Sequence, residues 1–299
     1  MAKARLTFLG TGTSQGVPII GCRCEVCSST DPRDKRFRAS ALVEYEGLTI
    51  LIDAGPDFRS QMLAAGVRHL DAILLTHNHK DHTGGLDDVR ALNYIDRSAV
   101  EIYCEERVLK SLKVEYSYAF AEDKYPGAPE WHVHLIDETP FKVRKESYGE
   151  LTWMHDVGYG YIQPDGTFVK SKGTTVDPAP AFDDPCEGAG IIPIRGYHDQ
   201  MPVLGYRFGD IAYITDMSSI PEEEFAKLRG LKHLTLNTVG YKKHHSHFSL
   251  EEAEALAARI GAEHTWLTHL SHTFPVHSEF SKALPEGILP AYDGLVIEG

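Results

Sequence analysis

The densest chemical signal in the chain is a group of three histidines and one aspartate within six positions: His77, His79, Asp81 and His82. The group follows the apolar run 72–75, which we expect to form a buried strand. Loops at strand ends hold functional side chains on a rigid base. Imidazole and carboxylate groups bind zinc, manganese and iron. The spacing lets His77 and His79 share one ion while Asp81 and His82 turn toward a second, so this segment predicts a metal centre.

A second cluster of metal-binding side chains lies near the start of the chain, where three cysteines follow C-x-C-x-x-C spacing. Cys22, Cys24 and Cys27 offer three thiolates, and tetrahedral zinc needs a fourth ligand, for which His272 is a candidate. Clustered cysteines in a chain without an export signal favour metal binding over disulfides. The two remaining cysteines are interpreted as buried thiols: Cys104 and Cys186.

A third histidine-rich stretch, 242–249, comes just before a helix predicted at Leu250–Ile260. Ser249 and Glu252 have the spacing of a capping box, which fixes the start of a helix. His247 therefore lies directly before a well-anchored helix start. The neighbouring lysines, Lys242 and Lys243, can help to attract a phosphate group.

The elements that must position these clusters alternate between short apolar strands and helices. This alternation predicts an α/β domain built in layers, and the length of 299 residues fits one large domain, 1–299. The segment 119–189 interrupts the pattern and is rich in Gly, Pro, Tyr and Asp, so we interpret it as an insertion or lid. A surface hairpin or dimer contact is an equal alternative. Side chains that could line a lid are Trp153, His155, Asp156, Tyr159 and Tyr161.

Composition and charge exclude several classes of protein. The chain has 30 Lys and Arg against 43 Asp and Glu, a formal net charge of −13, which argues against long nucleic acid as a partner. It contains no apolar run long enough to span a membrane, so we expect no membrane partner. The first residues lack the apolar core of a signal peptide, and we expect a cytoplasmic protein.

The His-x-His-x-Asp-His pattern after a buried strand resembles the metallo-β-lactamase superfamily. The resemblance implies a four-layered αββα sandwich with its metal site at one edge, where the two sheets meet. It also implies further ligands at later strand ends. His198 matches the third histidine of the first site, Asp216 the carboxylate that bridges both ions, and His269 the last histidine of the second site. Asp53 matches an early aspartate that we expect to support the histidines by hydrogen bonds rather than to bind metal.

The stretch from Gly10 to Cys27 is similar to the start of PhnP-type phosphodiesterases within that superfamily. In these relatives three cysteines and one histidine hold a structural zinc. The resemblance therefore implies one structural zinc here, which we assign to folding and not to chemistry. Its ligands would be Cys22, Cys24, Cys27 and His272.

The same resemblance implies a proton donor. In PhnP-type and ribonuclease Z-like enzymes, a histidine just before a capped helix assists departure of the leaving group. His247 matches this position best by its offset from the helix, and His244 and His245 are the alternatives.

The implied activity is hydrolysis of a phosphodiester by two divalent ions, zinc or manganese, with iron a further option. A hydroxide bridging the ions would attack phosphorus, Asp216 would contact both ions, and His247 would protonate the leaving group. The charge of −13 and the lack of a basic, Gly-rich arm favour a small cyclic or nucleotide-like substrate. Two alternatives stay open: a thioester or lactone hydrolase on the same scaffold, and a non-catalytic metal-binding protein. The oligomeric state is open too, with a homodimer as one outcome.

Overall fold

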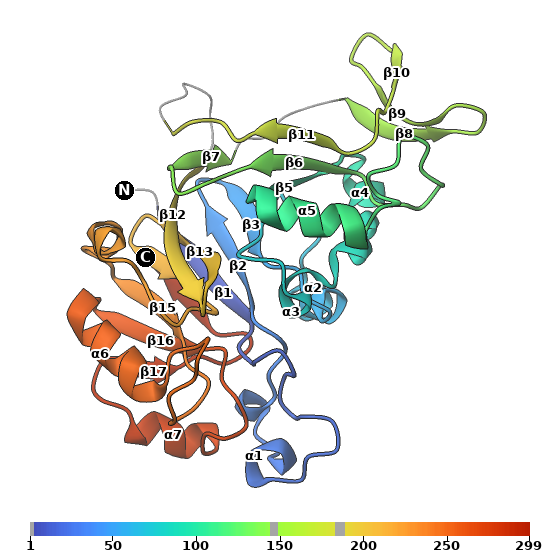
Figure 1. The fold of residues 1–299 in the computed structure, drawn as a ribbon. Helices are drawn as coiled ribbons and strands as arrows, with labels where there is room; N and C mark the ends of the chain where they lie inside the picture. Colours follow the sequence, from blue (N-terminus) through green and yellow to red (C-terminus); the bar gives the residue numbers. More distant parts are fainter. Residues whose placement is uncertain (1–2, 144–148, 183–188) are drawn as a thin grey trace.

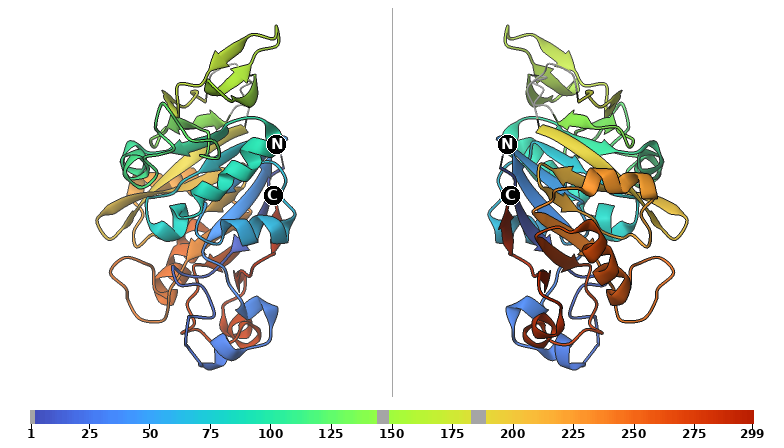
Figure 2. Two further views of the ribbon diagram at one scale, coloured as in Figure 1. Left: turned by 90° about the vertical axis from the view of Figure 1, so that its right-hand side faces the viewer. Right: turned by 90° about the vertical axis from the view of Figure 1, so that its left-hand side faces the viewer.

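The computed structural model describes residues 3–143, 149–182 and 189–299. Two large β-sheets face each other at the centre of the molecule, and helices cover their outer faces (Figures 1 and 2). The arrangement is the four-layered αββα sandwich that the sequence predicts. Within the described ranges, no helix combines the length and the apolar character needed to cross a membrane.

The first sheet has eight strands in the order β11-β6-β5-β4-β3-β2-β1-β18. Strands β3 to β6 run parallel, whereas β1 and β2 form antiparallel pairs. The strands are β1 Arg5–Gly10, β2 Ser40–Tyr45, β3 Leu48–Ile52, β4 Ala72–Leu74, β5 Val100–Cys104, β6 Trp131–Leu135, β11 Thr175–Pro178 and β18 Val296–Glu298. The helices of this half are α2 Phe58–Ala65, α3 Lys80–Thr83, η2 Leu86–Val89, α4 Arg90–Asp96 and α5 Glu106–Glu115.

The second sheet has seven strands in the order β17-β16-β15-β14-β13-β12-β7, and β14 to β17 run parallel. The strands are β7 Phe141–Val143, β12 Ala189–His198, β13 Met201–Phe208, β14 Ile211–Tyr213, β15 His233–Asn237, β16 His264–Thr268 and β17 Ile288–Pro290. The helices of this half are η3 Glu222–Leu228, α6 Leu250–Ile260 and α7 His277–Ala283. The element η3 is a 3₁₀ helix, whereas α6 and α7 are α-helices.

The alternation of side chains along each strand divides the apolar residues among three cores. Phe8, Tyr206 and Tyr213 belong to the core between the sheets and are fully buried. A second core, which includes Ile73 and Leu112, lies between the first sheet and its helices, and a third lies between the second sheet and α6. Apolar faces on both sides of each sheet hold the strand ends in fixed relative positions.

The segment 119–189 contributes strands to both main sheets as well as a projection. β6 and β11 extend the first sheet, and β7 extends the second. A separate three-stranded sheet contains β8 Glu150–Met154, β9 Gly158–Ile162 and β10 Phe168–Lys170. We call 150–170 the arm; it projects from the upper right of the sandwich in Figure 1. The arm is an addition to the sandwich, whereas β6, β7 and β11 belong to its layers.

Candidate metal centre

The ends of strands from both sheets bring the seven predicted active-site ligands together. β4 is followed by the loop that carries two histidines, and α3 carries the next two ligands. β12 ends at the third histidine, and the loops after β14 and β16 carry the remaining pair. The seven residues are His77, His79, Asp81, His82, His198, Asp216 and His269.

Three of these imidazoles converge as one group. The ring centres of His77 and His79 are 4.6 Å apart, and those of His79 and His198 are 5.0 Å apart. The rings of His77 and His198 are separated by 6.0 Å. Nε2 of His77 is buried and has no hydrogen-bond partner among the described residues. A buried nitrogen without a partner, facing two further imidazoles, fits a site for one metal ion.

A second group shares a carboxylate with the first. The ligand atoms of Asp81, His82, Asp216 and His269 all lie within 4.8 Å of one another. One oxygen of Asp216 lies 3.0 Å from Nε2 of His82, and the other lies 3.1 Å from Nε2 of His269. Asp216 also forms a compact group with His198 and His247. The Asp216 carboxylate therefore faces both groups, as a ligand that bridges two ions must.

The protonation states favour metal binding at neutral pH. Burial lowers the pKa of His77 well below its usual value, and burial also lowers the pKa of His79 and of His198. Burial opposes ionisation of Asp216, but His269 and His82 outweigh it and hold the pKa of this carboxyl well below its usual range. Neutral imidazoles and ionised carboxylates are the forms that bind metal.

His82 differs from the other histidines because carboxylates surround it. Burial opposes its protonation, but Asp216, Asp81 and Asp53 raise the pKa of His82 well above its usual value. Its Nε2 lies between two of these carboxylates, 3.0 Å from Asp216 and 3.3 Å from Asp81. A proton and a metal ion compete for the same nitrogen, so this anionic surrounding suits a divalent cation.

Asp53 lies behind His82 and makes the supporting contacts expected of it. One of its oxygens is 2.6 Å from Nδ1 of His82 and accepts a hydrogen bond from the Thr76 hydroxyl at 2.8 Å. The other accepts from the Thr76 backbone N–H at 2.9 Å. These bonds turn Nε2 of His82 toward the centre of the site. Thr76 therefore helps to hold Asp53 in place, a role that the pattern of metal ligands in the sequence does not reveal.

The backbone is held in unusual conformations where the loops leave the strands. Asp53, Asp216 and His269 have φ values of 61°, 56° and 56°, in the left-handed region that non-glycine residues seldom adopt. A Cβ on Gly55 would lie 2.0 Å from the Asp81 carbonyl oxygen. Helix α3, which carries Asp81, therefore packs directly on residue 55. The sequence contains this glycine, but its role becomes visible only when α3 and the loop after β3 are seen in contact.

His247 lies closest to the metal cluster of the three candidate proton donors. Its ring is 4.5 Å from that of His198 and 4.8 Å from that of His269. His244 lies behind it, with ring centres 5.2 Å apart, and His245 contacts His244. Burial and the neighbouring His269 lower the pKa of His247 to about 3. It is therefore neutral at neutral pH unless an anion beside it stabilises the imidazolium form, and its acid role stays a prediction.

The three cysteines and His272 form a second, separate metal-binding group. Nδ1 of His272 lies 3.3 Å from the Cys22 sulfur and 3.5 Å from each of the other two sulfurs. In tetrahedral zinc, the usual Zn–S and Zn–N bond lengths place these atoms about 3.5 Å apart. A hydrogen bond from the Cys27 backbone lowers the pKa of Cys24 to about 6, whereas burial raises that of Cys27 to about 11. The geometry fits a closed zinc site between α1 (Glu25–Ser28) and the loop after β16.

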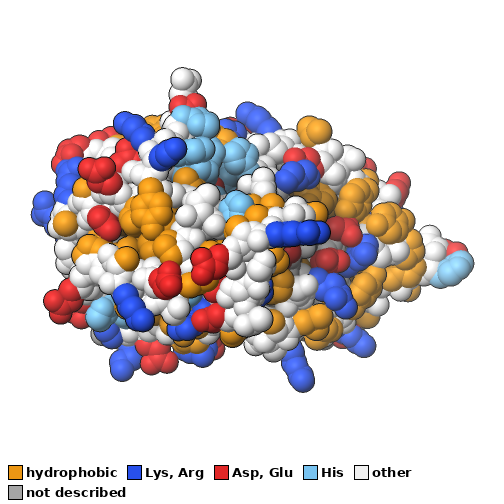
Figure 3. Space-filling view, turned by 90° about the horizontal axis from the view of Figure 1, so that it is seen from below, with side chains coloured by type: hydrophobic (Ala, Val, Ile, Leu, Met, Phe, Trp, Pro, Cys, Tyr) orange, Lys and Arg blue, Asp and Glu red, His pale blue; other side chains and the backbone are white. Residues whose placement is uncertain are grey.

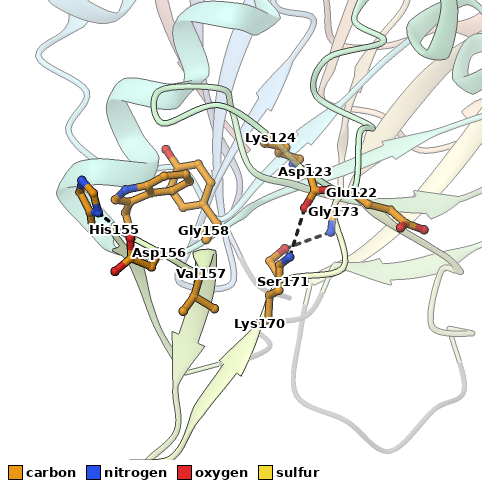
Figure 4. A pocket seen from close by; sticks show the side chains of 12 residues that line it. Glu122, Asp123, Lys124, His155, Asp156, Val157, Gly158, Lys170, Ser171 and Gly173 are labelled. Atoms are coloured by element: carbon orange, nitrogen blue, oxygen red, sulfur yellow. Dashed lines mark hydrogen bonds and ion pairs between the residues drawn. The ribbon is translucent and has the colours of Figure 1, made fainter.

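The arm does not form the predicted lid over the metal cluster. Trp153, His155, Asp156 and Tyr159 instead line a surface pocket of about 210 Å³, together with Lys170 and residues of the loop 122–124 (Figure 4). No metal ligand lines this pocket. Tyr161 is buried, and its hydroxyl oxygen lies 3.2 Å from Nε2 of His132. The side chains that line this pocket therefore lie away from the metal ligands.

The structure tests the prediction of a buried thiol for one of the two isolated cysteines. Cys104 is fully buried in the core beneath the helices of the first sheet, as predicted. Burial raises the pKa of its thiol to about 12, so it stays protonated and unreactive. The prediction for Cys186 lies outside the described residues.

Comparison with known proteins defines the class. Residues 49–270 match the model of a family described as the beta-lactamase superfamily domain, and the chain belongs to this superfamily. An octanoyltransferase from Porphyromonas gingivalis is 38% identical over 294 residues. The match covers 97% of this chain but 51% of that protein, so the chain spans about half the length of this relative.

Similarity to solved structures indicates the branch of the superfamily to which this chain is similar. A structure described as a new diphosphatase from the PhnP family is 37% identical, with a TM-score of 0.79, and the match covers 100% of this chain and 98% of the other. The PhnP-type resemblance predicted from the sequence is thereby confirmed. The short form of human tRNase Z shares the fold, with a TM-score of 0.58 at 18% identity over 98% of each chain.

Proposed function

We propose that the protein is a metal-dependent hydrolase of small phosphodiesters. The position of Asp216 carries the proposal, because its carboxylate faces the groups of His82 and His269 on one side and His198 on the other. The 37% identity to a diphosphatase of the PhnP family supports phosphorus chemistry.

Two divalent ions, zinc or manganese, would supply positive charge to the phosphoryl oxygens and acidify a water molecule. This chain's own residues position that chemistry. Asp53 fixes the orientation of His82, and Asp216 holds the two ligand groups together. His247 lies at the side of the cluster next to His198 and His269, where it can hold a proton for the departing oxygen.

A small substrate fits the charge of the molecule better than a long nucleic acid does. The formal net charge is −13, which opposes the binding of a long polyanion along the surface. The arm, which projects at the upper right of Figure 1, carries apolar and acidic side chains as well as lysines. We expect recognition to be local to the metal cluster.

Thioester hydrolysis is the second candidate function. One observation favours it: the 38% identical relative from Porphyromonas gingivalis is named an octanoyltransferase. That relative is about twice as long as the part matched here, so its name need not describe the matched half. A thiolate leaves without protonation, and a thioester hydrolase would therefore not depend on His247.

The test compares the hydrolysis of a phosphodiester and of a thioester by one protein preparation reconstituted with manganese or zinc. We expect turnover of bis(p-nitrophenyl) phosphate and none of an octanoyl thioester. His247→Ala should slow hydrolysis of a diester with an alkoxide leaving group about 100-fold, the usual size of a general-acid effect, and affect the nitrophenyl ester far less. Turnover of the thioester alone would overturn the proposal in favour of the second candidate.

A further inference from the structure

The group of three imidazoles takes its members from both halves of the sandwich. His77 and His79 lie in the loop after β4 of the first sheet, whereas His198 ends β12 of the second sheet. Figure 3 shows histidine side chains gathered on one area of the face seen from below, with Lys and Arg side chains beside them. The distance between the ligands of one ion therefore depends on contacts that join the two halves near these strand ends.

Strand β13 of the second sheet contacts the segment that leads into the histidine loop. The Tyr206 hydroxyl donates a hydrogen bond to the Leu75 carbonyl at 2.7 Å. The Leu204 backbone N–H donates to the Thr76 carbonyl at 3.1 Å. These two contacts are direct, and they proceed along β13 toward its start, where the strand pairs with His198.

Arg107, in the first turn of α5, supplies the next contact in this direction as a bridge. Its Nη1 donates to Oδ1 of Asn78 at 2.5 Å, and its Nη2 donates to the Pro202 carbonyl at 2.6 Å. Asn78 separates the two histidines of the loop, and Pro202 lies opposite the residue before His198. The planar guanidinium therefore joins both halves through two fixed donors, which the single ammonium group of a lysine does not reproduce.

The partners of the bridge are themselves held in place. Nδ2 of Asn78 donates to the Ser111 hydroxyl oxygen at 2.8 Å, so two residues of α5 fix the Asn78 amide. At the start of the same helix, the Glu105 carboxylate accepts hydrogen bonds from Arg195 of β12 at 2.5 and 3.1 Å. Helix α5 is therefore attached to the second sheet beside the bridge, although it covers the first.

The two bridging hydrogen bonds account for the polar contacts of the Arg107 side chain within the described ranges. Its Nε is buried and has no hydrogen-bond partner there, and the nearby Glu105 carboxylate is paired with Arg195. A buried donor without an acceptor costs free energy. The placement of Arg107 is therefore set by the bridge and not by an ion pair.

We propose that Arg107 is a positioning residue of the metal centre, whose bridge sets the distance between the histidines of the loop after β4 and His198. The inference rests on the proposed function, because it assigns a residue that prepares one of the two ion sites for that reaction. Without the bridge, the ion at the three imidazoles should bind more weakly. The ion site that includes His82 and His269 does not depend on this contact between the halves.

Manganese binding tests the bridge without any substrate. Protein that retains its structural zinc is titrated with manganese, and the free ion is measured by its electron paramagnetic resonance signal. We expect Arg107→Lys and Arg107→Met each to raise one of the two dissociation constants about tenfold, the usual size for loss of a contact that orients a metal ligand, and to leave the other within about twofold. Lys110→Met, at an exposed position of the same helix, is the matched control and should change neither constant.

Asp53→Asn identifies which of the two ions responds. Asp53 orients His82, so this variant should raise the other dissociation constant, and the double variant with Arg107→Lys should raise both. Wild-type binding of both ions by Arg107→Lys would overturn the inference, because the charge alone would then suffice. An increase of the same constant by Asp53→Asn and Arg107→Lys would overturn it too. So would equal weakening of both ions with a lower thermal midpoint, which indicates a general loss of packing.

The titration separates this inference from the proposed function. A wild type that binds two ions but hydrolyses no phosphodiester would overturn the proposed function alone, because the role of Arg107 is measured by ion binding. A wild type that binds fewer than two manganese ions would overturn both.

Discussion

Asp53 shows how a residue that binds no metal can control one that does. It is completely buried. Its two oxygens accept hydrogen bonds from the backbone N–H and the hydroxyl of Thr76, and one of them also pairs with Nδ1 of His82. Four of the ligands are predictable from their spacing along the chain, because His77 to His82 form one local pattern, whereas the other three ligands were predicted only through the resemblance to the superfamily. The contact of Thr76 with Asp53 joins two strands and is not visible in either segment alone.

At the scale of single residues, Asp53→Asn should loosen the orientation of His82 and lower metal affinity about 10- to 100-fold without unfolding the protein. The amide of asparagine keeps the shape of the side chain but lacks the negative charge that attracts the His82 imidazole. Competition with a chelator measures the effect. Asp156→Asn, at an exposed position on the arm, is the control, and equal affinities in both variants would contradict the supporting role.

His277 should make the folded state sensitive to acid. Burial, together with the nearby Arg36 and Arg33, lowers the pKa of His277 from its usual 6.5 to about 4. The unfolded chain therefore binds a proton at a pH where the folded protein does not, and stability is lost as the pH falls from 6.5 toward 4. The free energy of unfolding should fall more between pH 7 and pH 5 in the wild type than in His277→Gln.

The control for this pH dependence is His155→Gln, because the His155 side chain is 97% exposed. This variant should keep the pH dependence of the wild type in urea unfolding. If the free energies of unfolding of the wild type and of His277→Gln change in parallel between pH 7 and pH 5, the prediction that His277 is buried in its neutral form is wrong.

At the scale of elements, the helix α6 is the clearest case in which local sequence specifies structure. The predicted bounds, Leu250–Ile260, agree with the observed ones, and the capping box of Ser249 and Glu252 is formed. Gly261 ends the helix in the left-handed conformation. The 3₁₀ geometry at Glu222–Leu228 was not predictable in the same way, because spacing alone does not distinguish it from an α-helix.

Removal of the cap should weaken α6 by a measurable amount. Ser249→Ala leaves the Glu252 backbone N–H without its acceptor and should cost about 1 kcal/mol in the free energy of unfolding. Glu252→Gln is the matched variant, because glutamine also completes a capping box and should cost much less. Urea unfolding at saturating metal measures both, and equal losses would contradict this account of the helix start.

At the scale of the whole molecule, two sheets and a separate metal-binding group bring distant segments together. The cysteines near the start of the chain meet His272 about 250 residues later, which only the packing of the complete sandwich can achieve. The sequence predicts the layers, because strands and helices alternate regularly. It does not predict that β6, β7 and β11 within 119–189 join the main sheets, because these strands are short and their partners lie far away along the chain.

The cysteine group should contribute to stability and not to the chemistry. Cys24→Ser should remove one zinc per chain and lower the thermal midpoint, while the correctly folded fraction keeps its turnover. Metal analysis and thermal unfolding measure the two effects. Cys104→Ala removes a cysteine elsewhere and should leave the zinc content unchanged. A Cys24→Ser protein of normal stability that loses catalysis alone would refute the structural assignment.

The most direct test of the central claim is a metal titration of the hydrolysis of bis(p-nitrophenyl) phosphate, with Asp216→Ala as the comparison. The account predicts that activity rises as two equivalents of manganese or zinc bind beyond the structural zinc, and that Asp216→Ala stays inactive at every metal concentration. Full activity of Asp216→Ala, or turnover by the wild type that does not depend on added metal, would contradict a reaction centred on the carboxylate between the two ligand groups.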